Sequence, residues 1–120
     1  MTIGGHRSER LAEEIHNEID LMLAGELKDP RLAGSMIVTD VRLSPDMRTV
    51  RVFVRLFGTE AERAEELAGL KAASGYVRHE LVERLQLRRA PEVFFLEDQS
   101  EEYGQHIDQL LRKVKETDDR

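Results

Sequence analysis

Residues 71–78 read KAASGYVR, and they decide the fold because they place three small residues, Ala73, Ser74 and Gly75, inside an otherwise helical pattern. Apolar residues recur at helical spacing on both sides of this stretch. Glycine between two such patterns is the natural place for a bend. The stretch therefore predicts two helices joined by a sharp kink.

The ends of this helix pair can also be predicted. Thr59-Glu60-Ala61-Glu62 has the form of a capping box, in which the threonine oxygen caps backbone donors and Glu62 reaches back. The first helix of the pair therefore begins at this point. The second continues helical spacing through Val77 and Leu81 to Leu85.

Two strands precede the helix pair. Residues 35–43 and 49–57 are rich in β-branched and apolar residues and flank the turn sequence SPDMR at 44–48, which predicts a β-hairpin. In the second strand aliphatic residues alternate with arginine and phenylalanine. The mixed face has two interpretations, an open sheet face covered by arginine stems or a binding surface, and the sequence leaves both open.

Three further elements complete the chain. Residues 8–27 have one broad apolar stripe and predict an amphipathic helix, which Pro30 brings to an end. Residues 92–97 predict a third strand. Residues 100–115 predict a last helix that needs a surface to pack on, because its apolar residues form a narrow stripe: Tyr103, Ile107, Leu110, Leu111 and Val114.

These elements predict an α+β fold, with the first helix and the kinked pair packed on one face of a three-stranded sheet. We expect residues 1–7 to be a flexible N-terminal tail, residues 8–99 to form the domain, and residues 100–120 to form the C-terminal helix and a frayed tail. A length of 120 residues fits one domain.

The composition narrows the possible chemistry. Cysteine is absent, which excludes disulfides, thiolate metal sites and a cysteine nucleophile. The four histidines lack ligand spacing, no Gly-x-Ser-x-Gly elbow is present, and no phosphate or dinucleotide loop occurs. We therefore expect no catalytic residues, metal or cofactor. No signal peptide or long apolar run is present, so we expect a soluble, cytoplasmic protein without a membrane partner.

Charge is distributed unevenly along the chain. The net charge is −6, but residues 1–27 carry −4, residues 28–89 carry +3 and residues 90–120 carry −5. Binding depends on the local face rather than on the average, so the basic middle segment can still face phosphates.

The kink lies within this basic segment and is suited to phosphate binding. Backbone amides at a helix N-terminus and the absence of bulky side chains allow a phosphate chain to approach, while Lys71 and Arg78 could neutralise it on either side. Arg84, Arg88 and Arg89 follow, against Glu80 and Glu83. An ordinary helix break is the alternative interpretation.

Four short motifs in this order resemble ribosome-binding factor A: KDPR at 28–31, LSPDM at 43–47, ASGYVR at 73–78 and LRRAPEV at 87–93. The resemblance covers roughly residues 8–99. It implies a type II KH-like fold, in which an Ala-x-Gly kink stands where RNA-binding KH domains have Gly-x-x-Gly. It also implies a non-catalytic assembly factor that binds the immature small ribosomal subunit. The implied role is in late rRNA maturation, including processing of the 5′ end, and in bacterial growth in the cold.

The resemblance also implies partners and contact residues. The partners are the small ribosomal subunit and its rRNA, with assembly GTPases as further candidates, and the protein is expected to act as a monomer. Combined with the basic residues of the segment 71–89, the expected rRNA contacts are Lys28, Arg31, Lys71, Ala73, Ser74, Gly75, Arg78, Arg88 and Arg89. The sequence departs from the family pattern at Gln86, where many relatives are basic, and at Arg89, often an apolar position.

A second function remains compatible with the residues themselves. A protein-interaction domain could use the acidic first helix or the Arg and Phe sheet face. Salt dependence separates the two, because a phosphate-binding face weakens steeply with salt whereas a protein interface depends on apolar anchors.

Overall fold

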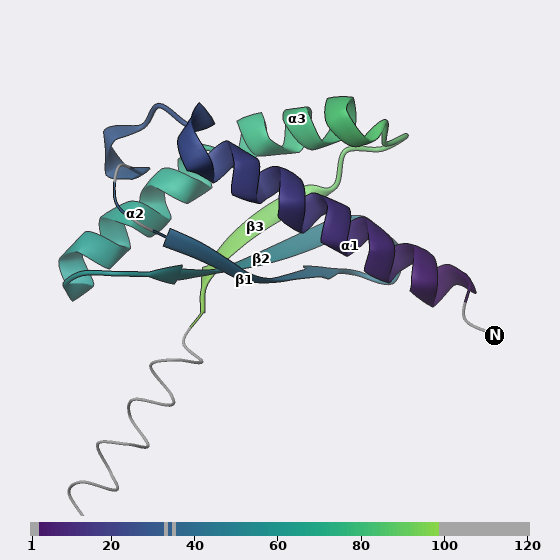
Figure 1. Ribbon diagram of the computed structural model, residues 1–120, viewed down its shortest axis with the longest axis horizontal. Helices are drawn as coiled ribbons and strands as arrows, with labels where there is room; N and C mark the ends of the chain where they lie inside the picture. Colours follow the sequence, from purple (N-terminus) through teal and green to yellow (C-terminus); the bar gives the residue numbers. More distant parts are fainter. Residues whose placement is uncertain (1–2, 33, 35, 99–120) are drawn as a thin grey trace, which may run out of the picture.

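The computed structural model describes residues 3–32, 34 and 36–98 of the chain. The elements follow one another as shown in Figure 1: α1 (Ile3–Leu21), a π-helical turn η1 (Met22–Glu26), a 3-10 turn η2 (Pro30–Leu32), β1 (Met36–Leu43), β2 (Thr49–Leu56), α2 (Glu60–Ala72), α3 (Ser74–Leu85) and β3 (Glu92–Glu97).

The sheet has the order β1-β2-β3 and mixes two kinds of pairing. β1 and β2 form the predicted antiparallel hairpin, while β3 lies parallel to β2. A parallel neighbour needs a crossover connection, which α2 and α3 supply. A bulge at Thr39 shifts the β1 register between Val38 and Asp40.

The helices cover one face of the sheet, as predicted (Figure 1). Alternation in β2 explains this layering, because Val50, Val52 and Val54 are fully buried while the residues between them lie on the other side. The core is small and mostly aliphatic: Ile15, Ile19, Met22, Val38, Val41, Val50, Val52, Val54, Leu56, Leu70, Val77, Leu81, Val93 and Phe95.

The predicted bounds of the first helix were wrong at both ends. The helix begins at Ile3 rather than Ser8, and its α-helical part ends at Leu21 rather than Leu27. A wide turn follows, in which the N–H of Leu27 donates to the carbonyl oxygen of Met22. Gly25 adopts a non-helical φ of 158° in this turn and interrupts the α-helix, while Met22 of the predicted apolar stripe stays fully buried.

The remaining predicted elements are either confirmed or lie outside the described residues. The hairpin, the capping box, the kinked pair and the third strand are confirmed within one residue. The predicted C-terminal helix lies outside the described residues. The division into tail, domain and C-terminal segment stays a prediction.

Candidate nucleic-acid interface

The kink between α2 and α3 is held by backbone and side-chain hydrogen bonds of its own. The Ala73 N–H donates to the carbonyl oxygens of Gly69 and Leu70, each at 3.0 Å. The Ser74 hydroxyl donates to the carbonyl oxygen of Lys71 at 2.7 Å. Ser74 therefore closes the end of α2, which is a structural role for a residue predicted to contact rRNA.

Gly75 is different, because nothing within the fold requires a glycine there. It is exposed in the first turn of α3, and a Cβ built on it meets no atom within 4 Å. Gly75 does not adopt a positive φ, so its backbone geometry is open to other residues as well. The expected approach of a phosphate chain to the kink stays a prediction.

The N-terminus of α3 is open. Its cap residue, Ala73, makes no side-chain capping hydrogen bond, and the first amides of any helix have no acceptor within the helix. The amides of Ser74 and Gly75 belong to this turn. Backbone donors at a helix start favour an anion, and a Cβ built at Gly75 meets no atom within 4 Å, so the space beside this residue is open.

A groove of about 320 Å³ runs beside the kink. It brings Lys28 next to Ala73 although the two are far apart in sequence. The groove is mixed in charge, since its lining residues are Glu26, Leu27, Lys28, Asp29, Ala72, Ala73 and Tyr76. Lys28 and Lys71 are both exposed, on either side of the kink.

Arg31 is already paired within the chain. Its guanidinium lies 2.6 Å from Asp29, and its backbone N–H donates to the same carboxylate at 2.9 Å. These hydrogen bonds lower the pKa of Asp29. Arg31 is half-exposed, so it can reach a phosphate only while sharing its charge with Asp29.

Arg78 also makes internal contacts. Its Nη2 donates to the carbonyl oxygen of Ala90 at 3.2 Å and lies 3.5 Å from the Glu92 carboxylate. Arg78 therefore ties α3 to the loop that leads into β3, while leaving part of its guanidinium exposed.

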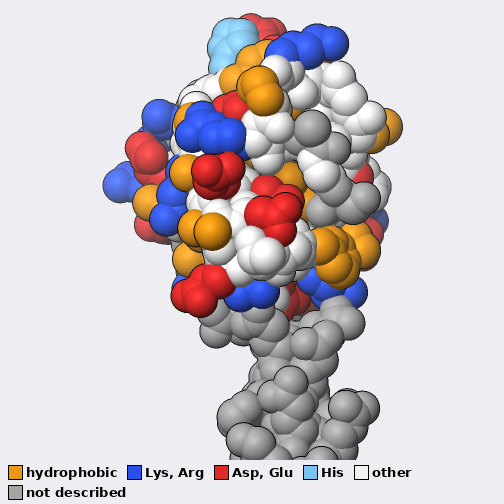
Figure 2. Space-filling view, turned by 90° about the vertical axis from the view of Figure 1, so that its left-hand side faces the viewer, with side chains coloured by type: hydrophobic (Ala, Val, Ile, Leu, Met, Phe, Trp, Pro, Cys, Tyr) orange, Lys and Arg blue, Asp and Glu red, His pale blue; other side chains and the backbone are white. Residues whose placement is uncertain are grey.

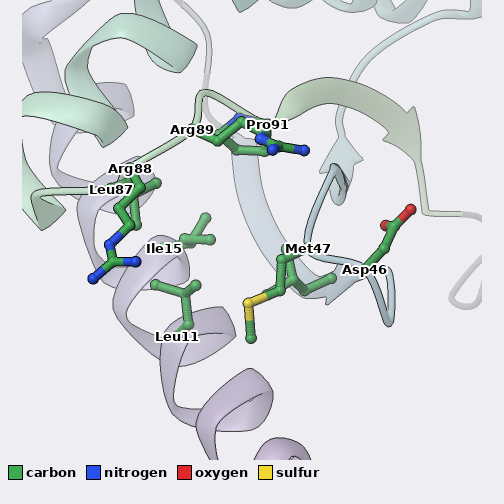
Figure 3. Close-up of a pocket in the computed structure, with 9 residues that line it drawn as sticks. Leu11, Ile15, Asp46, Met47, Leu87, Arg88, Arg89 and Pro91 are labelled. Atoms are coloured by element: carbon green, nitrogen blue, oxygen red, sulfur yellow. The ribbon is translucent and has the colours of Figure 1, made fainter.

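Arg88 and Arg89 lie at the mouth of an apolar pocket of about 270 Å³ (Figure 3). Both side chains are exposed, and no ion pair to either is found among the described residues. The pocket lies between α1, the hairpin turn and the α3–β3 loop, and its lining is Leu11, Ile15, Leu43, Asp46, Met47, Leu87, Arg88, Arg89 and Pro91.

The predicted residues thus form a line rather than a single patch. Lys28, Lys71 and the kink lie at the start of α3, Arg78 lies one turn along it, and Arg88 and Arg89 follow its end. At 1.5 Å per residue, the 12 residues of α3 separate the two ends by about 18 Å. The end of the molecule where α2 begins carries both acidic and basic side chains (Figure 2).

Arg84, counted in the basic segment, is not available to a partner. Its guanidinium lies between three carboxylates: Glu18 at 3.3 Å, Glu80 at 3.1 Å, and Glu26 in direct contact. The pKa of Arg84 is raised by these hydrogen bonds. Segment 71–89 therefore exposes less positive charge to a partner than its sequence suggests.

Tyr76 was not among the residues predicted to contact rRNA. It is 44% exposed directly after Gly75, and it lines the groove with Lys28. An exposed aromatic beside backbone donors and a cation can stack on a base. Its position next to the glycine was the available signal.

Residues 3–32, 34 and 36–98 contain no cluster of three His, Cys, Asp or Glu side chains that could hold a metal ion. No helix in the same residues is long and apolar enough to cross a membrane.

Fold and site together define a class: a small α+β domain built on a helix–kink–helix unit, with cations along the second helix and open backbone donors at its start. The sequence profile of ribosome-binding factor A matches residues 7–111. The chain belongs to the ribosome-binding factor A family.

Individual relatives agree with this assignment. The ribosome-binding factor A of Cyanothece sp. is 52% identical over 92% of this chain and 83% of its own length. The NMR structure of a Thermotoga maritima protein described as a ribosome-binding factor A is 35% identical. It has a TM-score of 0.68 and covers 78% of this chain and 89% of its own. A Thermus thermophilus homologue, fitted into a cryo-electron microscopy map of a 30S complex with that factor, has a TM-score of 0.51 at 29% identity. It covers 82% of this chain and 94% of its own.

Proposed function

We propose that this protein binds the immature small ribosomal subunit through rRNA, using the line that runs from Lys28 and the kink to Arg88 and Arg89. The observation that carries the proposal is Gly75, an exposed helical glycine at which an added Cβ would meet no atom within 4 Å. A glycine costs helix stability, so its position favours close approach by an outside partner. The Thermus thermophilus homologue in a 30S complex supports that partner.

The residues at the two ends of α3 contact different parts of the RNA in this proposal. At the start of α3, open amides receive a phosphate, Lys28 and Lys71 neutralise its neighbours, and Tyr76 stacks on a base. About 18 Å away, Arg88 and Arg89 contact phosphates further along the RNA. Contacts to the backbone position the protein on RNA shape and carry little sequence information.

The role itself is assembly rather than catalysis. The protein would hold a conformation of the small-subunit rRNA during late maturation, so that processing of the 5′ end is affected indirectly. Its kinked helix pair would act as the Ala-x-Gly unit of a type II KH-like domain. The proposal includes three further properties. The protein supports growth in the cold, it acts as a monomer in the cytoplasm, and assembly GTPases release it from the subunit.

The experiment compares opposite charge changes of equal size. Arg88→Glu and Arg89→Glu should each weaken binding to immature small subunits and lower the slope of log affinity against log salt by about one. Thermal unfolding should hardly change, because exposed charges contribute little to stability. Co-sedimentation and chemical footprinting of the rRNA provide the measurements.

Glu14→Lys is the matched control. Glu14 is exposed on α1, so its reversal changes the net charge as much as Arg88→Glu does, in the opposite sense. A localised site predicts a small change for Glu14→Lys. Equal and opposite shifts in the two variants would show that general electrostatics, and no defined site, governs the affinity. Glu18 is unsuitable because it pairs with Arg84.

A further inference from the structure

The sheet has one face that no described helix covers (Figure 1). This open face carries apolar side chains from two strands: Ile37 of β1 is 48% exposed, and Phe94 and Leu96 of β3 are 50% and 37% exposed. Exposed apolar residues scattered singly are normal, but neighbours gathered on one face indicate a contact surface.

The strand register places Phe94 and Leu96 two residues apart on the open face of β3, while Ile37 lies on β1 opposite Arg55. Phe94 pairs with Arg51, and Leu96 pairs with Phe53. Arg42 lies over the Phe53 ring at 5.4 Å, so arginine stems cover part of the face. The interpretation as an open face under arginines is therefore correct for Phe53, while Phe94 and Leu96 remain half-exposed.

The described chain leaves the sheet beside this face. The Asp98 N–H donates to the carbonyl oxygen of Val54 at 2.8 Å, and the Asp98 carboxylate accepts from the Thr39 hydroxyl. Val54 of β2 and Thr39 of β1 thus both take part in fixing the exit point. The next 22 residues, 99–120, start there.

The sequence of residues 100–115 has the properties that a cover for this face requires. Its narrow apolar stripe has no use in a solvated helix. Sixteen helical residues span about 24 Å, and an eight-residue strand spans about 26 Å, so a helix turned back from Asp98 matches the sheet in length. Residues 100–120 carry six acidic and four basic side chains, while Arg42, Arg51 and Arg55 lie on the open face.

We propose that residues 100–115 form a helix that folds back and packs its stripe of Tyr103, Ile107, Leu110, Leu111 and Val114 on the open sheet face, over Phe94 and Leu96. The domain then has three layers, with the sheet between the α1–α2–α3 layer and its own C-terminal helix. This inference is independent of the proposed rRNA contact, which lies along α3.

The absence of native cysteine allows a direct test, because a single introduced thiol reports on one position. Arg51→Cys places the thiol on the open face opposite Phe94 and leaves the exposed apolar residues of the face in place. In the full-length protein this thiol should react about tenfold more slowly with a maleimide than a thiol at the exposed position Glu83→Cys on α3, because a covered site reacts only when the segment opens.

The stripe is then disrupted in the same full-length background. Ile107→Glu with Leu110→Glu should restore fast labelling at position 51, whereas Gln105→Glu with Gln109→Glu adds the same charge on the opposite side of the predicted helix and should leave labelling slow. Circular dichroism of each variant confirms that the described core remains folded.

Three results would overturn the proposal. The thiol at position 51 could react as fast as the one at position 83. Its protection could depend on protein concentration, which would identify a second copy as the cover. Protection could also appear only when small subunits are added, which would assign the face to the ribosome.

Discussion

Gly69 and Gly75 both lie in the kinked helix pair, but only Gly69 has neighbours that a methyl group would touch. A Cβ built at Gly69 lies 3.0 Å from Cδ2 of Leu32 and 3.1 Å from Cβ of Arg31. Gly69 therefore allows η2 to pack on α2, and this contact places the loop containing Lys28 beside the kink. Gly75 has no comparable role inside the fold.

Replacing the two glycines separates a structural from a binding role. Gly75→Ala should stabilise the free protein by about 0.5–1 kcal/mol, since alanine loses less backbone entropy in a helix, and should weaken subunit binding. Gly69→Ala should gain less, because Leu32 and Arg31 must shift. Thermal unfolding and co-sedimentation measure both effects. Unchanged subunit binding by Gly75→Ala would remove the glycine from the mechanism.

Glu66 is the buried charged residue of the described core. It faces inward from α2, and its Oε1 accepts no hydrogen bond from any residue that the structure describes. Burial, followed by the nearby Glu62 charge, raises the pKa of Glu66. A carboxyl with a raised pKa in the folded state costs stability as the pH rises above its ordinary value of 4.5, and the cost is complete above the folded-state pKa.

Glu66→Gln should therefore raise the melting temperature at neutral pH, because the amide keeps the shape of the side chain and removes the buried charge. The advantage should disappear below the ordinary carboxyl pKa of 4.5, where glutamate is protonated in both folded and unfolded chains. Calorimetry across this pH range tests it. A lower melting temperature for Glu66→Gln at neutral pH would show that the ionised form is needed.

At the scale of elements, the Arg84 network fastens α3 to α1 and to η1, through Glu18 and Glu26. Hydrogen bonding to Arg84 lowers the pKa of Glu26. A carboxylate with a lowered pKa contributes stability that is complete above its ordinary value of 4.5 and is lost as the pH falls through the folded-state pKa.

Arg84→Met should lower the melting temperature at neutral pH, because three carboxylates then face one another without a cation. The difference from the unsubstituted protein should shrink as the pH falls below 4.5 and through the lowered pKa of Glu26, where this carboxylate loses its charge. Melting curves in low-salt buffers measure the difference. A gap of constant size down to pH 2 would assign the loss to packing of the arginine stem instead.

The elements that sequence could predict are those fixed by local chemistry. The capping box at Thr59 needs only Glu62, and the hairpin needs only its turn and two alternating strands. Arg84 pairs with Glu18, 66 positions away, and with Glu26, 58 positions away, and no local pattern encodes such contacts. The sequence shows which residues are basic, but only long-range contacts decide which of them stay exposed along α3 and which are paired within the fold.

At the scale of the whole molecule, the proposed binding surface is positively charged although the net charge of the chain is negative. The net charge of −6 repels RNA at long range, and the free cations at the two ends of α3 act only at contact. Affinity for the small subunit should therefore fall with added salt, as counterion release requires, in spite of the acidic composition. Binding measured between 50 and 200 mM salt tests this, and affinity that rises with salt would contradict a phosphate contact.

The parallel pairing of β2 with β3 fixes the order in which this chain can fold during its own synthesis. The β1–β2 hairpin closes over a short turn and can form early, because loop closure costs little over short separations. β3 cannot join until both crossover helices and Glu97 have left the exit tunnel. Until then the nascent chain exposes the β2 edge, and a ribosome that stalls before Glu97 would hold an unpaired strand open to aggregation.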